Sequence, residues 1–160
     1  MSGTLTGIFV ADSAGTPMRS LDRAELVAGR GIAGDRYFTE TGTFSPKAKK
    51  PSQEVTLVEA EEIAAFNAVA GTQFRVEDLR RNLITRGIRL NDLLGVEFVV
   101  GTVVLKGIRL CEPCSYLAGL TSGAILPGLA HRAGIRAAIV SGGIASVGDA
   151  IVPAVAASGT

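Results

Sequence analysis

The chain has 160 residues, of which 47% are hydrophobic and 19% are charged, and its formal net charge is +1. This length suits a single domain with a hydrophobic core, and the composition excludes a disordered chain. The small net charge argues against a dedicated nucleic-acid-binding protein, which would carry a basic excess. The first eight residues lack the basic and apolar segments of a secretory signal, and the apolar residues 137–157 are interrupted by glycine and proline. We therefore expect a cytoplasmic protein without a membrane span.

The first third of the chain predicts short strands and loops. Residues 5–11 and 25–28 have the composition of strands. A glycine-rich turn follows at residues 29–36, and residues 39–53 form the longest polar segment, which we expect to be a loop.

The middle of the chain predicts one clear helix between strands. Residues 54–59 are strand-like, and residues 59–70 combine an acidic first turn with an apolar face, which is typical of a helix that ends at Gly71. Residues 82–85 are again strand-like, and residues 90–95 predict a helical turn closed by glycine.

The last third predicts a hairpin, two short helices and two final strands. The hairpin strands cover 96–100 and 102–110 and reverse at Gly101; the helices cover 115–120 and 125–133; the final strands cover 135–140 and 149–152. About eight short strands with two or three short helices predict a mixed, β-rich, barrel-like fold over residues 1–160. A doubly wound sheet fits less well, because helices and strands do not alternate regularly.

The segment Cys111-Glu112-Pro113-Cys114 contains both cysteines of the chain. A zinc site would need further ligands, and the chain has only one histidine, His131. The spacing also suits a redox dithiol, although the βαβ context typical of that motif is missing. A single thiolate that binds a soft metal or carries sulfur is a third interpretation, and two inert buried thiols are a fourth.

Three further segments carry candidate polar residues. Arg80 and Arg81 would point to opposite faces of a strand, so only one of them could join Asn82 in an anion site; the alternative is a surface arginine paired with Glu77 or Asp78. In Gly34-Asp35-Arg36 the carboxylate could orient an arginine or simply hold a turn. His131 could serve a site or end a helix.

Together these segments resemble the MOSC domain family, which includes the C-terminal domain of molybdenum cofactor sulfurases and stand-alone bacterial proteins. The resemblance rests on five motifs in family order: Gly31-x-x-Gly34-Asp35-Arg36-Tyr37, Arg81-Asn82-x-x-x-Arg86-Gly87 with Leu90, Leu93 and Gly95, Phe98-x-x-Gly101, Cys111-x-Pro113-Cys114, and His131-Arg132-x-Gly134 with Gly148-Asp149. It implies a barrel fold and a pocket for the pterin molybdenum cofactor or a small anionic ligand.

The resemblance also implies roles for individual residues. Cys114 would ligate molybdenum or carry sulfur; the cofactor-binding residues would be Arg81, Asn82, Gly34, Asp35, Arg36 and His131. Some relatives reduce N-hydroxylated bases, which here would require an external electron donor; the alternative is a non-catalytic carrier of sulfur or cofactor that works with a partner protein. No lysine has the context of a Schiff base, so pyridoxal phosphate is not expected. We expect Cys114 and Arg81 to line one cleft, with Arg36 or His131 at its rim and residues 39–53 as a lid.

Overall fold

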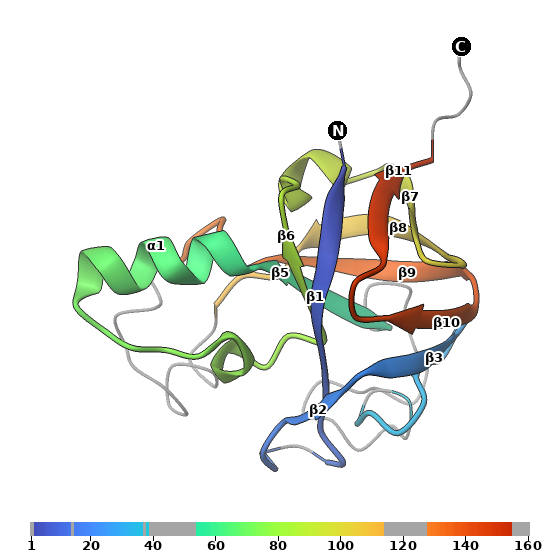
Figure 1. Cartoon of the computed structure of the whole chain (residues 1–160), viewed down its shortest axis with the longest axis horizontal. Helices are drawn as coiled ribbons and strands as arrows, with labels where there is room; N and C mark the ends of the chain where they lie inside the picture. The colour runs from blue at the N-terminus through green and yellow to red at the C-terminus, as the bar shows by residue number, and fades with distance from the viewer. Residues whose placement is uncertain (1, 14, 37, 39–53, 114–127, 155–160) are drawn as a thin grey trace.

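The computed structural model describes residues 2–13, 15–36, 38, 54–113 and 128–154. Its main element is a closed barrel of seven strands (Figure 1). These are β1 (Gly3–Val10), β5 (Val55–Glu59), β6 (Leu83–Arg86), β7 (Glu97–Val100), β8 (Val103–Leu110), β9 (Ile135–Ser141) and β11 (Ala150–Pro153). The β-rich barrel predicted from the sequence is confirmed.

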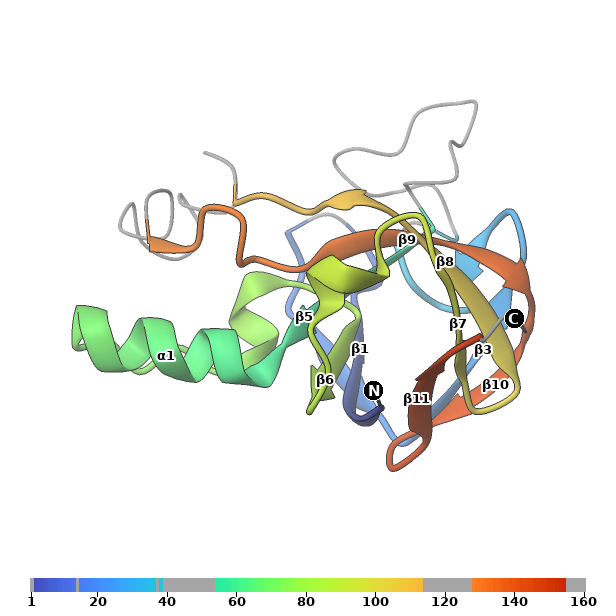
Figure 2. The same cartoon turned by 90° about the horizontal axis from the view of Figure 1, so that it is seen from above.

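The order of strands around the barrel is β1-β6-β5-β9-β8-β7-β11, and β11 pairs again with β1. Figure 2, viewed from above, shows these strands as a ring. The closing contacts place Gly3 opposite Ile151 and Thr4 opposite Ala150. Every pair in the ring is antiparallel except β5–β6, which is parallel.

The parallel pair β5–β6 is connected through the helix α1 (Ala60–Ala70), because parallel neighbours need a long crossover. The helix ends as predicted at Gly71, whose φ of 70° is a left-handed conformation that glycine adopts without steric cost. It lies outside the barrel (Figure 1), and its buried Ile63 and Phe66 belong to a second apolar cluster with Ile84 and Leu129. No helix among the described residues is long and apolar enough to cross a bilayer.

The barrel interior is filled by apolar side chains, most of them aliphatic. Alternate residues of β7 and β8 point inward, so Phe98, Val100, Val103 and Leu105 are completely buried. They pack in one cluster with residues from the other strands of the ring, such as Leu57 of β5. The barrel is therefore a packed core, and any ligand site has to lie at its ends or on its outside.

A small second sheet consists of β3 (Arg23–Val27), β4 (Gly31–Ile32) and β10 (Gly143–Ser146), and β3 matches the strand predicted at residues 25–28. β4, β10 and β2 (Arg19–Leu21), which extends the main sheet beside β1, were not predicted from the sequence. The 3-10 helices are η2 (Val76–Leu79) and η3 (Leu90–Leu93). Only η3 matches a predicted helical turn. The helix expected at 115–120 lies outside the described residues, as does the start of the helix expected at 125–133. Of the rest of that stretch, Gly128 is helical and residues 129–132 form turns.

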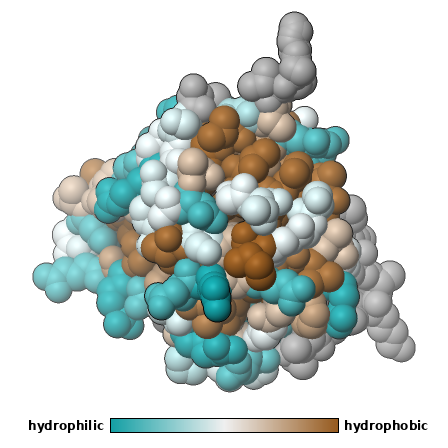
Figure 3. Space-filling model, turned by 45° about the vertical axis from the view of Figure 1, so that its right-hand side comes forward, coloured by the Kyte–Doolittle hydropathy of each residue, from teal (hydrophilic) through white to brown (hydrophobic). Residues whose placement is uncertain are grey.

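Apolar side chains also occur on the outer face of the barrel. Figure 3 brings this side forward and shows apolar areas between polar ones. Val152 pairs with Val99, and Val99 pairs with Val104, so three valines form an outward row across β11, β7 and β8. Val152 is exposed and the other two are partly buried.

Glu59, half-buried between β5 and α1, makes the stability of this junction depend on pH. Burial raises the pKa of its carboxyl, and the negative charges of Glu62 and Glu61 raise it further, although the main-chain N–H of Leu90 donates to Glu59 Oε2 at 3.1 Å and lowers it. A raised pKa in the folded protein means that ionised Glu59 opposes folding above that pKa. Below the unfolded pKa both states are protonated, and this cost disappears.

We predict that Glu59→Gln leaves stability nearly unchanged at pH 4 and raises it relative to wild type at pH 7. Glutamine keeps an acceptor for Leu90 but carries no charge. Urea unfolding at a series of pH values measures the difference, and Glu97→Gln, at an exposed carboxylate on β7, is the control. If the stability gain of Glu59→Gln over wild type becomes smaller from pH 4 to pH 7, the raised pKa of Glu59 is contradicted.

Candidate functional site

Asp35 is completely buried near the end of the glycine-rich turn at residues 29–36, which contains β4. Its Oδ1 accepts hydrogen bonds from the main-chain N–H of Ala11 at 3.0 Å and from Arg36 Nη1 at 3.2 Å. Arg36 is also buried, and its Nη2 donates to the carbonyl oxygen of Arg80 at 3.0 Å. The Asp35–Arg36 pair therefore connects the turn to the end of β1 and to the residues before β6.

The glycine-rich turn packs against protein main chain. Gly31 has a φ of 120°, and a Cβ there would lie 2.7 Å from the carbonyl oxygen of Glu54. The Glu54 carboxylate is itself buried, and its Oε1 accepts from the N–H groups of Gly29 and Ile139, each at 3.0 Å. Gly34, with a φ of 89°, is exposed. Its contact with a ligand stays a prediction.

The predicted alternation of Arg80 and Arg81 on a strand is wrong, because β6 begins only at Leu83. Arg80 caps η2 in a left-handed conformation with a φ of 60°, and its Nη1 donates to the carbonyl oxygen of Thr16 at 2.6 Å. This cap turns the chain, and the strand rule for side-chain direction does not apply there.

Arg81 is buried, and each of its guanidinium nitrogens donates to main-chain carbonyl oxygens. Nε donates to Ala133 at 2.8 Å and Nη1 to Leu79 at 3.0 Å. Nη2 donates to Cys111 at 2.8 Å and, more weakly, to Glu112 at 3.5 Å. One side chain thus holds together the end of η2, the first half of the Cys111–Cys114 segment and the turn before β9.

Asn82 is completely buried beside Arg81 and connects β1 and β5. Its Oδ1 accepts from the N–H and the hydroxyl of Thr56, both at 3.1 Å, and its Nδ2 donates to the carbonyl oxygen of Phe9 at 3.1 Å. In return, the N–H of Asn82 donates to Thr56 Oγ1 at 3.0 Å. Both the oxygen and the nitrogen of the side-chain amide therefore bind protein groups. A direct contact of Asn82 with a cofactor stays a prediction.

The two cysteines differ in what the structure describes. Cys111 is a free thiol, 3% exposed, and its N–H donates to the carbonyl oxygen of Gly134 at 2.8 Å. Gly134 lies against the carbonyl oxygen of Leu57 with no room for a Cβ. Cys114 lies outside the described residues, as does the proposed lid at 39–53. Within the described ranges, no three side chains from His, Cys, Asp or Glu gather closely enough to hold a metal ion.

His131 lies in the turn next to the Cys111–Cys114 segment and contacts Glu112. Its Nδ1 is 2.6 Å from Glu112 Oε2, and its main-chain N–H donates to Glu112 Oε1 at 2.6 Å. The His131 side chain is 76% exposed. Its φ of 64° is unusual for a residue other than glycine. Glu112 was not singled out in the sequence, because its partner lies 19 residues away.

The structure therefore joins four segments that are far apart in the sequence. Arg36 contacts Arg80, Arg81 contacts Cys111, and Glu112 contacts His131. These contacts run largely through main-chain atoms, and those of Arg81 and His131 involve the residues that precede Cys114 in the chain. The predicted common cleft of Cys114 and Arg81 stays a prediction.

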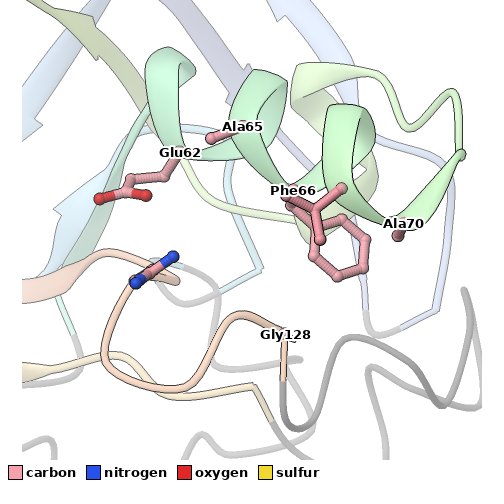
Figure 4. Close-up of a pocket in the computed structure, with 7 residues that line it drawn as sticks. Glu62, Ala65, Phe66, Ala70 and Gly128 are labelled. Atoms are coloured by element: carbon pink, nitrogen blue, oxygen red, sulfur yellow. The ribbon is translucent and has the colours of Figure 1, made fainter.

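Two pockets occur among the described residues, and Arg80, whose carbonyl oxygen accepts from Arg36, lines the second of them. The first, about 350 Å³, lies between α1 and the turn at Gly128, and its lining includes Glu62, Phe66 and Arg132. Figure 4 shows the Phe66 ring directed toward Gly128. The second, about 570 Å³, is lined by residues that include Met18, Phe74 and Arg80. No predicted site residue lines either one.

Solved structures of other proteins share this fold. The chain resembles the YuaD protein from Bacillus subtilis, with 20% identity over 94% of each chain and a TM-score of 0.80. It also resembles YiiM from Geobacillus stearothermophilus, with 16% identity over 98% of this chain and 77% of that one and a TM-score of 0.72. A third similar structure is YiiM from Escherichia coli, with 16% identity over 97% of this chain and 70% of that one and a TM-score of 0.67. At these identities the likeness shows the fold alone. A search of curated proteins finds no match.

The family itself is shown by a family model. The model described as the MOSC domain matches residues 45–152, which is more than half of the chain. This range includes Arg81, Asn82, the Cys111–Cys114 segment and His131. The chain belongs to the MOSC domain family.

Proposed function

We propose that this protein binds the pterin molybdenum cofactor, or a related anionic species, and that the Cys114 thiolate ligates molybdenum or carries sulfur. The observation that carries the proposal is the buried positive charge of Arg81. Among the described residues, its partners are carbonyl oxygens, and no carboxylate forms an ion pair with it. A buried cation without a counter-charge is costly, so a thiolate or an anionic ligand nearby lowers its free energy.

The chemistry of the proposed ligands supports this proposal. A thiolate is a soft ligand suited to molybdenum, and positive charge nearby favours the thiolate over the thiol. Arg81 holds the main chain of Cys111 and Glu112, which fixes the start of the segment that ends at Cys114. Arg36 supports the same region by holding the carbonyl oxygen of Arg80.

When bound, the cofactor supplies two-electron redox chemistry at the metal. The chain's own contribution is to hold the cofactor's anionic end near Arg81 and to present a sulfur ligand. With an external electron donor, such a site would reduce N-hydroxylated small molecules. Without a stably bound metal, the same cysteine would deliver sulfur or cofactor to a partner protein.

We predict that Cys114→Ser abolishes loading of molybdenum or sulfur, because a hydroxyl matches the thiol in size but is neither a soft ligand nor a persulfide carrier. Cys111→Ser is the matched control. Its buried thiol is expected to affect stability modestly and loading very little. Both variants and the wild type are purified from a host that makes the cofactor, and molybdenum and protein-bound sulfur are measured per chain.

The results separate the two uses of Cys114. Stoichiometric molybdenum in wild type supports a cofactor-binding oxidoreductase, and a persulfide on Cys114 without metal supports the carrier. Equal loading of the wild type and the Cys114→Ser variant would contradict the proposal.

A further inference from the structure

The carboxylate of Glu112 contacts two nitrogen atoms of His131. One oxygen accepts from the main-chain N–H of His131, and the other lies 2.6 Å from Nδ1 of the ring. The carbonyl oxygen of His131 accepts from Asn91 Nδ2 at 2.9 Å. Three of the four polar atoms of His131 therefore have partners. The fourth, Nε2, has no hydrogen-bond partner among the described residues.

This arrangement is maintained against a backbone cost. A left-handed conformation costs a residue other than glycine on the order of 1–3 kcal/mol and persists only where its surroundings enforce it. At His131 the three contacts from Glu112 and Asn91 supply that enforcement. Such conformations often occur at functional sites, where the orientation of one side chain matters.

The chemistry of the two Glu112 contacts determines which ring nitrogen carries the proton. An ionised carboxylate only accepts hydrogen bonds, so the main-chain N–H and Nδ1 of His131 must both donate. In a neutral imidazole, a proton on Nδ1 leaves Nε2 as an acceptor. The ring thus presents an outward acceptor on an exposed side chain.

We propose that Glu112 is a positioning residue that fixes His131 in the Nδ1–H tautomer, so that Nε2 accepts a hydrogen bond from an N–H or O–H group of the ligand. The assignment of His131 to the ligand site rests on the proposed function. The tautomer itself rests only on the contacts of Glu112. Glu112 is joined to the proposed site through Arg81, which donates to the carbonyl oxygens of Cys111 and Glu112.

Glu112→Gln tests the tautomer with little change in shape. A glutamine has one acceptor and one donor group, so it keeps both contacts only if its oxygen takes the main-chain N–H and its NH₂ faces Nδ1. Nδ1 then becomes the acceptor and the proton moves to Nε2. We expect the Nδ1–H tautomer in wild type and the Nε2–H tautomer in the variant.

Long-range ¹H–¹⁵N correlation spectra of the metal-free protein measure the tautomer directly, recorded at a pH at which the ring signals themselves show a neutral imidazole. His131 is the only histidine of the chain, so its ring signals need no further assignment. Asn91→Ala is the matched control, because it removes the contact to the carbonyl oxygen of His131 and leaves the ring contact in place. Its tautomer is expected to match wild type.

An Nε2–H tautomer in wild type, or no change in Glu112→Gln, would overturn the proposal. A merely structural role for Glu112 would change the melting temperature and leave loading intact in the folded variant. The positioning role predicts molybdenum content about three- to tenfold lower in Glu112→Gln, the effect of one neutral hydrogen bond. A switched tautomer with unchanged loading would overturn the ligand-facing role of Nε2. If the wild type and Glu112→Gln show the expected tautomers but neither protein loads molybdenum or sulfur, the tautomer assignment is confirmed and the proposed function is contradicted.

Discussion

Arg81→Ala is expected to lower the free energy of unfolding by at least about 3 kcal/mol, because it leaves several buried carbonyl oxygens without donors at about 1–3 kcal/mol each. The affected carbonyls belong to Leu79, Cys111 and Ala133, with a weaker contact to Glu112. The same change releases the main chain that leads to Cys114. Loading of molybdenum or sulfur is therefore expected to fall even at temperatures where the variant remains folded.

Urea unfolding and metal analysis of three variants separate the contributions of Arg81. Arg81→Lys keeps the positive charge but cannot reach several carbonyls with a planar fork, so it should recover part of the loading and little of the stability. Arg89→Ala is the control, because Arg89 is 73% exposed and its ion pair with Asp92 spans 3.8 Å. That change should alter stability by less than about 0.5 kcal/mol. Similar stability losses for Arg81→Ala and Arg89→Ala would show that the buried contacts contribute little.

Asp35→Ala is the second substitution with a large expected effect. It removes the Asp35 carboxylate that pairs with the buried guanidinium of Arg36 and accepts from the Ala11 N–H. Breaking a buried ion pair by removing one partner costs about 3–5 kcal/mol, since the remaining charge stays buried. We expect a loss of that size, measured by chemical unfolding, together with weaker anchoring of the turn at Gly34.

The chain contains a closely matched control for this change. Asp12 and Arg19 form an ion pair at 3.2 Å, the same distance as Asp35 and Arg36, but their side chains are 74% and 50% exposed. Asp12→Ala should therefore cost no more than about 1 kcal/mol. If Asp35→Ala and Asp12→Ala lower the free energy of unfolding equally, burial does not strengthen the contribution of the Asp35–Arg36 pair.

Much of the barrel could be predicted from local patterns. The alternating apolar residues of β7 and β8, with a reversal at Gly101, appear in the sequence as a hairpin, and α1 ends at Gly71 as its pattern indicates. β10 was predicted as part of a turn, because Gly142 and Gly143 are typical turn residues. Its strand conformation comes from pairing with β3, more than a hundred residues earlier, which no local pattern contains.

The candidate site was harder to predict in detail. The motifs identified Arg81 and Asp35, but they could not reveal that both side chains bind protein groups rather than solvent. Arg80 was misplaced because a left-handed arginine has no sequence signal comparable to that of glycine. Glu112 acquires its role only when the turn containing His131 packs beside it.

The pairing of β1 with β11 has a kinetic consequence. Thr4 meets Ala150, so the contact that closes the ring spans almost the entire chain and gives the fold a high contact order. The β7–β8 hairpin and the β5–α1–β6 unit form from nearby residues and pay a smaller loop-closure entropy. We expect these two units to form early and the ring to close last, so that an open, edge-exposed barrel precedes the native one.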